Sequence, residues 1–228
     1  PKASAFTEFI AANWAPAEDD GYTREPVADY AAERRAKISK AFPGERLVLP
    51  AGPLKVRSND CDYRFRAHSA FAHLAGLGGE KEPDSVLVLE PNEDGTHTAL
   101  LFFKPRASRS SKEFYANPRY GEFWVGARPS LEEVSAATGL ETRHIDTLRD
   151  ALSKDAGQVS LRIVRGVDAQ IEDMVNEIRI QASLPFGDDA REEDEALEER
   201  LSEIRPKKDA YEIEEMIRAV EVTKAGFE

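Results

Sequence analysis

Runs of apolar residues along the chain predict a set of buried β-strands. Residues 46–50, 85–90 and 98–103 are each almost continuously apolar, a pattern typical of strands that are covered on both faces. The second and third runs flank residues 91–95 (PNEDG), whose proline, asparagine and Asp-Gly favour a reversal of the chain. We therefore expect an antiparallel hairpin there. Weaker runs predict short strands at 123–125, 141–145 and 159–164.

Apolar residues spaced three and four positions apart predict helices between these strands. Asp29 is the expected N-cap of a helix that runs to Phe42, and Gly44 is its stop signal. Ser130 and Glu133 have the spacing of a capping box, which opens a helix that ends near Gly139. Further helices are expected at 4–13, 146–154 and 169–182, the last with Ile171, Met174, Val175 and Ile178 on one face.

Strands interleaved with helices, together with one clear hairpin, indicate an α/β fold in three layers around a mixed sheet flanked by helices. Residues 1–27 lack periodicity beyond one short helix, so we expect an N-terminal arm there and a globular domain at 28–203. The stretch 188–203 is densely acidic but keeps a helical apolar stripe, which predicts an acidic surface helix. This helix is either a solvated face or a contact between subunits.

The last part of the chain, 204–228, is expected to be a linker followed by a new helix. Residues 206–208 (PKK) form the hinge, and Ile213, Met216, Ile217 and Val220 give the helix an apolar face without an evident partner. Because the chain begins at Pro1 without a methionine and ends within this helix, we expect it to be an excised fragment.

Composition and charge narrow the function. The chain is 41% hydrophobic and 32% charged, as in soluble globular proteins. Its net charge of −12 disfavours nucleic acid and anionic membranes as partners, since both need a basic face. No apolar run approaches the roughly 20 residues that span a bilayer, and one cysteine, Cys61, excludes an internal disulfide. We expect a cytoplasmic protein.

The stretch 60–76, DCDYRFRAHSAFAHLAG, concentrates the candidate chemistry of the chain. Its aromatic rings suit a core, whereas its arginines and histidines offer donors that suit a carboxylate or a carbonyl. The candidates for contact with a substrate are Tyr63, Phe65, Arg66, His68 and Phe71, although Phe71 fits the core better.

Four segments, in order and at matching spacing, resemble the N-terminal domain of aminopeptidase P. The first is Tyr63-Arg64-Phe65-Arg66 followed by Ser69, Phe71, Leu74 and Gly76, which looks like the signature of that family. The others are 83–89 (PDSVLVL), 121–126 (GEFWVG), and 204–208 (IRPKK) with Glu212-Ile213. The resemblance covers residues 30–228. It implies a sheet of ribonuclease-H-like topology, with 204–228 as the linker and first helix of a truncated catalytic domain.

The resemblance also implies a function for the parent protein. Aminopeptidase P enzymes are proline-specific metallopeptidases of the creatinase and prolidase group, which remove the N-terminal residue that precedes proline. Their two metal ions, usually manganese, are held by two aspartates, two glutamates and a histidine in a "pita-bread" domain that follows this region. The implied roles of the present chain are therefore not catalytic. The implied roles are the formation of a homo-oligomer and the closure of one side of the substrate channel. The implied partners are the C-terminal catalytic domain and the Xaa-Pro peptide.

The sequence departs from the family pattern within the signature. Ala70 stands where the family usually has an acidic residue, and Ala72 and His73 stand where it usually has aromatics. Two alternatives therefore stay open: a structural or oligomerisation module of a relative without peptidase activity, or a domain of a hydrolase similar to prolidase or creatinase.

Single residues also have plainer interpretations. Arg66 either reaches a substrate or catalytic domain or forms a structural ion pair, and His68 and His73 either titrate with a ligand or are structural. Asp60 and Asp62 form a DxD pair that suggests metal chemistry, but capping around a partly buried Cys61 is the simpler explanation. We expect no metal ligand and no cofactor in this chain. The loop 104–112 is basic and either binds an anion or is solvated.

Overall fold

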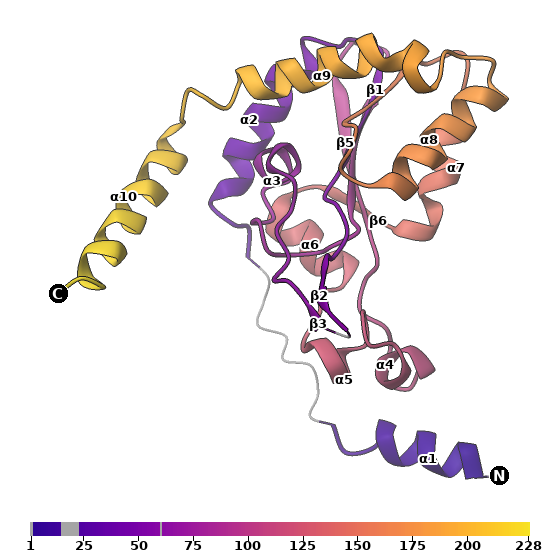
Figure 1. Ribbon diagram of the computed structural model, residues 1–228, viewed down its shortest axis with the longest axis vertical. Coiled ribbons are helices and arrows are strands. Elements are labelled where there is room, and N and C mark those ends of the chain that lie inside the picture. The colour runs from indigo at the N-terminus through magenta and orange to yellow at the C-terminus, as the bar shows by residue number, and fades with distance from the viewer. Residues whose placement is uncertain (1, 15–22, 60) are drawn as a thin grey trace.

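A computed structural model describes residues 2–14, 23–59 and 61–228 and shows one central five-stranded sheet within them (Figure 1). The strand order is β6-β5-β4-β1-β7, with β1 at Arg46–Pro50, β4 at Val86–Pro91, β5 at His97–Phe103, β6 at Glu141–His144 and β7 at Leu161–Ile163. β4 is antiparallel to both β1 and β5. The edge strands are parallel to their neighbours, β7 to β1 and β6 to β5. The sheet is thus mixed, as the sequence predicts.

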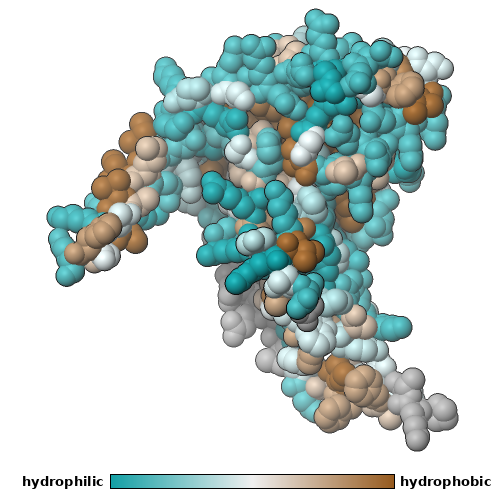
Figure 2. All heavy atoms as spheres, viewed as in Figure 1, coloured by the Kyte–Doolittle hydropathy of each residue, from teal (hydrophilic) through white to brown (hydrophobic). Residues whose placement is uncertain are grey.

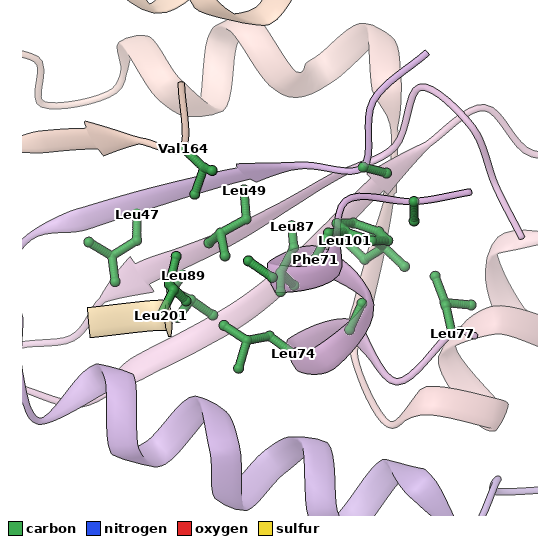
Figure 3. Packing of buried hydrophobic residues seen from close by; sticks show 14 of the residues in the cluster. Leu47, Leu49, Phe71, Leu74, Leu77, Leu87, Leu89, Leu101, Val164 and Leu201 are labelled. Carbon is green, nitrogen blue, oxygen red and sulfur yellow. The ribbon is translucent and has the colours of Figure 1, made fainter. Parts of the chain in front are cut away.

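The inner strands are apolar on both faces, and their alternation separates two hydrophobic clusters. Leu47, Leu49, Leu87, Leu89 and Leu101 face one cluster, which also holds Phe71 and Leu74 (Figure 3). Val48, Val86, Val88, Leu100 and Phe102 face the other. Since successive side chains of a strand point to opposite faces, a continuous apolar run requires cover on both sides.

Helices supply that cover and complete three layers. One face packs against α2 (Val27–Ser39), α3 (Ser69–Ala75), α6 (Leu131–Thr138) and α9 (Arg191–Glu203). The other packs against α7 (Leu148–Ser153) and α8 (Ala169–Gln181). The short 3-10 turns η1 (Ile145–Thr147) and η2 (Gly187–Ala190) lead into α7 and α9. The predicted α/β layers are confirmed.

Three appendages extend from the layered body (Figure 1). The first is a two-stranded antiparallel hairpin formed by β2 (Val56–Ser58) and β3 (Cys61–Asp62). α1 (Lys2–Ala11) contacts α4 (Lys112–Ala116), where Phe6 meets Tyr115 edge to face, and α5 (Glu122–Val125) packs beside α4. α10 (Ala210–Ala225) projects away from the body.

Several predictions of local structure are confirmed. The 46–50 strand and the 85–103 hairpin form as expected. Ser130 and Glu133 make the reciprocal hydrogen bonds of a capping box, and Gly139 ends that helix in the left-handed region. On α8, Ile171, Val175 and Ile178 are buried, as the apolar face predicts.

The predicted strand at 123–125 is wrong, because these residues form the helical turn α5. The turn closes when the amides of Trp124 and Val125 donate to the carbonyl of Gly121. A Cβ at Gly121 would lie within 2.6 Å of three carbonyl oxygens of the α4 segment, so only glycine permits this approach. The run therefore packs on α4 instead of pairing with a strand.

Two further predictions need correction. Asp29 is not an N-cap: α2 begins at Val27, after Pro26, and Asp29 lies in the first turn as the ion-pair partner of Arg24. Proline starts the helix earlier because its fixed φ suits a first turn. Cys61 is exposed rather than partly buried, because it lies on the β2–β3 hairpin.

A buried carboxylate ties the acidic helix to the sheet. Asp194 on α9 is fully buried and accepts two hydrogen bonds from the Arg179 guanidinium, at 2.7 and 3.0 Å. It also accepts from the backbone amide of Ile163 at 2.9 Å. The acidic helix is therefore not merely a solvated face, since one of its carboxylates anchors it to β7 and α8.

The start of α10 is held against the body by a second charged cluster. Arg34 on α2 is 5% exposed and donates to Asp209, the N-cap of α10, at 2.7 Å. Asp209 and Glu212 complete a capping box, and Glu212 lies 3.6 Å from His73 on α3. Burial, and then the positive charge of Arg34, lowers the pKa of His73 to about 4. This cluster fixes the angle at which α10 leaves the domain.

We predict that Asp194→Ala lowers the free energy of unfolding by about 3–5 kcal/mol, because it leaves the buried Arg179 cation without its carboxylate. Glu195→Ala on the same helix is the control. Its carboxylate is exposed and 3.7 Å from Arg191, so a change within about 0.5 kcal/mol is expected. Chemical denaturation of both variants measures the difference. Equal effects would mean that Asp194 does not anchor α9.

We also predict that His73 makes folding sensitive to acid. Its folded-state pKa of about 4 lies below the ordinary 6.5, so the unfolded chain takes up the proton first as pH falls between these values. Stability is therefore lost on acidification through this window, on the order of 1–2 kcal/mol between pH 7 and pH 5. Denaturant midpoints of the wild type and His73→Gln across this range test the prediction, and an unchanged slope in the variant would contradict it.

Candidate functional site

A cleft of about 790 Å³ lies where the signature stretch meets the linker to α10. Its walls come from the segment that follows β1, from the residues between the β2–β3 hairpin and α3, and from the linker between α9 and α10. Hydrophilic side chains surround the hairpin on this face of the molecule (Figure 2). The cleft therefore joins segments that are far apart in the sequence.

Backbone hydrogen bonds from the end of β1 set the shape of this cleft. The amide of His68 donates to the carbonyl of Ala51 at 2.8 Å, and the amide of Tyr63 donates to that of Lys55 at 2.8 Å. Gly52 adopts φ +95° and packs against Val167, so the chain can turn sharply as it leaves the sheet. The signature stretch is thereby fixed to the strand that lies inside the core.

The lining of the cleft is strongly cationic. Arg34, Lys55, Arg64, Arg66, Arg205 and Lys208 line it, whereas Glu212 is its acidic lining residue. Arg34 is paired with Asp209, and Arg64 is paired with Glu80. Among the described residues, Lys55, Arg66, Arg205 and Lys208 have no carboxylate partner. Arg205 instead donates to the hydroxyl groups of Ser69 and Ser202.

Two histidines lie in the same cleft and are held neutral at pH 7. Burial, and then the positive charge of Arg205, lowers the pKa of His68. The pKa of His73 is lowered by burial and by Arg34, as described above. The Nδ1 atom of His68 is buried and has no hydrogen-bond partner in the part of the chain that the structure describes. These imidazoles are suited to hydrogen bonding rather than to carrying charge.

The structure brings together most of the side chains that the sequence selected. Tyr63, Phe65, Arg66 and His68 all line the cleft. Tyr63 is 59% exposed while Phe65 is buried, so the two aromatics form the rim and the floor respectively. Arg66 is exposed and, within the described residues, forms no ion pair, which leaves the structural interpretation of this residue without support.

Phe71 does not line the cleft. Its ring is fully buried in the cluster beneath the sheet, beside the leucines labelled in Figure 3. The reason is its position on α3, because Phe71, Leu74 and Ala75 share the helix face that packs on β1 and β4. Phe71 is thus a core residue, as its alternative interpretation predicted, and is no longer a candidate for substrate contact.

The other candidate sites gain no support. Asp60 lies outside the described residues, and Asp62 is exposed on β3. Among the residues described, no group of three or more His, Cys, Asp or Glu side chains is placed to hold a metal ion. In the basic loop, Lys104 pairs with Glu113 and Arg106 with Glu133, so these charges are already compensated. No helix in the described part of the chain is long and apolar enough to cross a membrane.

Sequence reasoning missed several residues of the cleft. Arg34, Lys55 and Arg205 were not selected, because they lie on α2, on the segment before β2 and on the linker. The only local signal was the basic character of Arg205 and of the hinge at 206–208, within a chain of net charge −12. The cleft forms only when these distant segments meet in the fold.

Comparison with known proteins gives consistent matches to one family. The family model for the aminopeptidase P N-terminal domain matches residues 31–164. Xaa-Pro aminopeptidase 2 of Streptomyces coelicolor is 41% identical over 214 residues, which is 94% of this chain and 42% of the relative. Xaa-Pro aminopeptidase 1 of the same organism is 42% identical over 223 residues, 97% of this chain and 42% of the relative.

Solved structures agree on the fold. Proline aminopeptidase P II from Yersinia pestis superposes with a TM-score of 0.60 at 22% identity, over 82% of this chain and 41% of that one. Aminopeptidase P from Escherichia coli superposes with a TM-score of 0.56 at 21% identity, over 73% of this chain and 34% of that one. The chain spans less than half the length of the curated relatives described above. By the family model and by these relatives, the chain belongs to the aminopeptidase P N-terminal domain family.

Proposed function

We propose that this chain is the non-catalytic N-terminal domain of an Xaa-Pro aminopeptidase, which removes the residue that precedes proline. One observation carries the proposal. The Streptomyces Xaa-Pro aminopeptidases align with nearly all of this chain but with only 42% of their own length. More than half of each relative therefore follows or precedes the part that this chain represents, and we place the peptidase chemistry there.

The donor set of the cleft supports placing the metal elsewhere. The family implies two metal ions, and we propose manganese. The cleft residues do not fit such ions, because cationic side chains dominate the lining and repel a divalent cation. The carboxylate of Glu212 also already accepts a hydrogen bond from the backbone amide of Asp209 in the capping box of α10.

In the proposed enzyme, the cleft forms one side of the substrate channel. Tyr63, Phe65, Arg66 and His68 are the side chains that we propose to lie along it. The position of α10 supports this role, because the cleft and the first turn of α10 share Glu212. A catalytic domain that continues from α10 would begin next to the cleft. We further propose a domain boundary in the linker at 204–209, and a cytoplasmic location.

Exposed aromatic side chains support the proposal of a homo-oligomer. Phe6 and Phe9 on α1 and Phe123 and Trp124 on α5 are each at least 45% exposed. Exposed apolar surface on this scale is typical of contacts with another protein. We propose that this end of the domain packs against a second copy in the assembled enzyme.

The alternative is a structural domain of a relative without Xaa-Pro peptidase activity. One observation favours it: Ala70 stands where the family usually has an acidic residue. Ala70 supplies no carboxylate, and its methyl group is buried in the hydrophobic cluster of the domain. A further alternative is a domain of a hydrolase similar to prolidase or creatinase, which would act on a substrate other than that of an Xaa-Pro aminopeptidase.

We predict that the full-length protein releases the N-terminal residue from an Xaa-Pro tripeptide with added manganese, whereas residues 1–228 alone release none. Liquid chromatography of the two reactions, run side by side at equal concentration, measures this. A tripeptide with alanine in place of proline is the control for specificity. An inert full-length protein would favour the structural alternative, and activity of the 228-residue chain would contradict its proposed non-catalytic role.

A further inference from the structure

The cationic cleft is at odds with the charge of the chain around it. The protein carries 43 acidic and 31 basic residues, yet basic side chains dominate the lining of the cleft. Abundant acidic residues would be expected to neutralise these cations in ion pairs, as they do for Arg106 and Arg128. Within the described residues, Lys55, Arg66 and Arg205 instead keep their charge uncompensated at one place.

The effect of this charge is visible on neighbouring groups. Besides burial, Arg205 lowers the pKa of both His68 and His73, and Arg34 further lowers that of His73. Glu198 opposes the shift of His68, and Glu212 and Asp209 oppose that of His73, where the pKa stays low because burial is the largest cause. At His68 the effect of Arg205 exceeds that of Glu198, so the potential at this end of the cleft is positive. Such a potential attracts anions and repels cations.

The cleft also has the size and the donors of a ligand site. Its volume of about 790 Å³ lies within the range of roughly 300–1,000 Å³ that is usual for small-ligand pockets. Phe65 is buried beneath it and the Tyr63 ring is exposed at its rim, so apolar surface is available beside the charges. Planar guanidinium groups such as that of Arg66 are matched in geometry to carboxylates.

A further polar atom lacks a partner in the same place. Nδ1 of His68 is buried and unpaired among the described atoms, although the backbone amide of His68 is satisfied by Ala51. An unpaired buried polar atom costs free energy unless a ligand or water satisfies it. This observation is independent of the charge, and it concerns a residue that lines the same cleft.

We propose that the cleft binds the carboxylates of anionic peptides, so that acidic residues after the proline, together with the C-terminal carboxylate, are recognised by Lys55, Arg66 and Arg205. The consequence for the enzyme is a preference for acidic Xaa-Pro peptides, and this consequence rests on the function proposed above. The binding site itself lies within the present chain and does not depend on catalysis.

Isothermal titration calorimetry of the 228-residue chain tests the site directly. The peptides Ala-Pro-Glu-Glu, Ala-Pro-Gln-Gln and Ala-Pro-Lys-Lys differ in charge at similar size. We expect the acidic peptide to bind roughly tenfold or more tightly than the neutral one, since two or three exposed ion pairs add up to this factor. We expect the basic peptide not to bind, and the affinity for the acidic peptide to fall with added salt.

The double variant Lys55→Glu with Arg66→Glu is expected to lose the preference for the acidic peptide. Lys37→Glu with Lys40→Glu is the matched control, since it changes the net charge equally at exposed positions on and just after α2 that do not line the cleft. Circular dichroism verifies that both variants fold. Equal affinity for the three peptides, or an equal loss in the control variant, would overturn the proposal.

The kcat/KM of the full-length protein for the same peptides separates this proposal from the proposed function. Hydrolysis of Xaa-Pro peptides without an acidic preference would overturn the role of the cleft and leave the peptidase function standing. Selective binding of Ala-Pro-Glu-Glu by the 228-residue chain, together with an inert full-length protein, would support the cleft as a binding site for anionic peptides. The same result would overturn the peptidase function.

Discussion

Strand β1 is the element on which both the core and the cleft depend. Its side chains are buried on both faces of the sheet, and it pairs with β4 on one side and with β7 on the other. Where the strand ends, Ala51 accepts the amide of His68 and donates to the carbonyl of Ser85. The signature stretch is thus hydrogen-bonded to a fully buried strand. The rim of the cleft can therefore be polar and exposed while the segment beneath it is held in place.

The same constraint explains where the functional side chains lie. Because helices must cover both faces of the central strands, the faces of the sheet are not available for a ligand. Polar side chains are instead placed at the ends of strands and in the linkers that leave the body. Arg34 connects these regions, since it reaches from α2 to the carbonyl of His73 and to the carboxylate of Asp209. One buried guanidinium therefore couples the core, the cleft and the direction of α10.

Sequence patterns predicted the core well, because continuous apolar runs and capping residues act over short distances. The 46–50 strand, the hairpin and the helix opened by Ser130 depend on such local signals. The strand expected at 123–125 failed because three apolar residues fit a helical turn and a strand equally well. The deciding contact, between Gly121 and the carbonyls of the α4 segment, belongs to the fold rather than to the local pattern.

The candidate site was predicted only in part, for a related reason. Tyr63, Phe65, Arg66 and His68 lie in one short stretch, so their shared location was visible in the sequence. Arg34, Lys55 and Arg205 join them from segments that are remote along the chain, and no spacing rule indicates that they meet. Phe71 shows the opposite effect, because the α3 helix turns it away from its neighbours in the signature and into the core.

If the cleft of this domain faces the peptide in the intact enzyme, as we propose, photo-crosslinking detects the contact directly. Benzoylphenylalanine would replace Tyr63 in the full-length protein, which is then irradiated with a labelled acidic Xaa-Pro peptide that carries an uncleavable reduced bond. The same replacement at Phe186, which does not line the cleft, is the control. We expect labelling from position 63, and we expect excess unlabelled peptide to suppress it. Labelling that is absent, or equal from both positions, in an active enzyme would contradict the proposed contact.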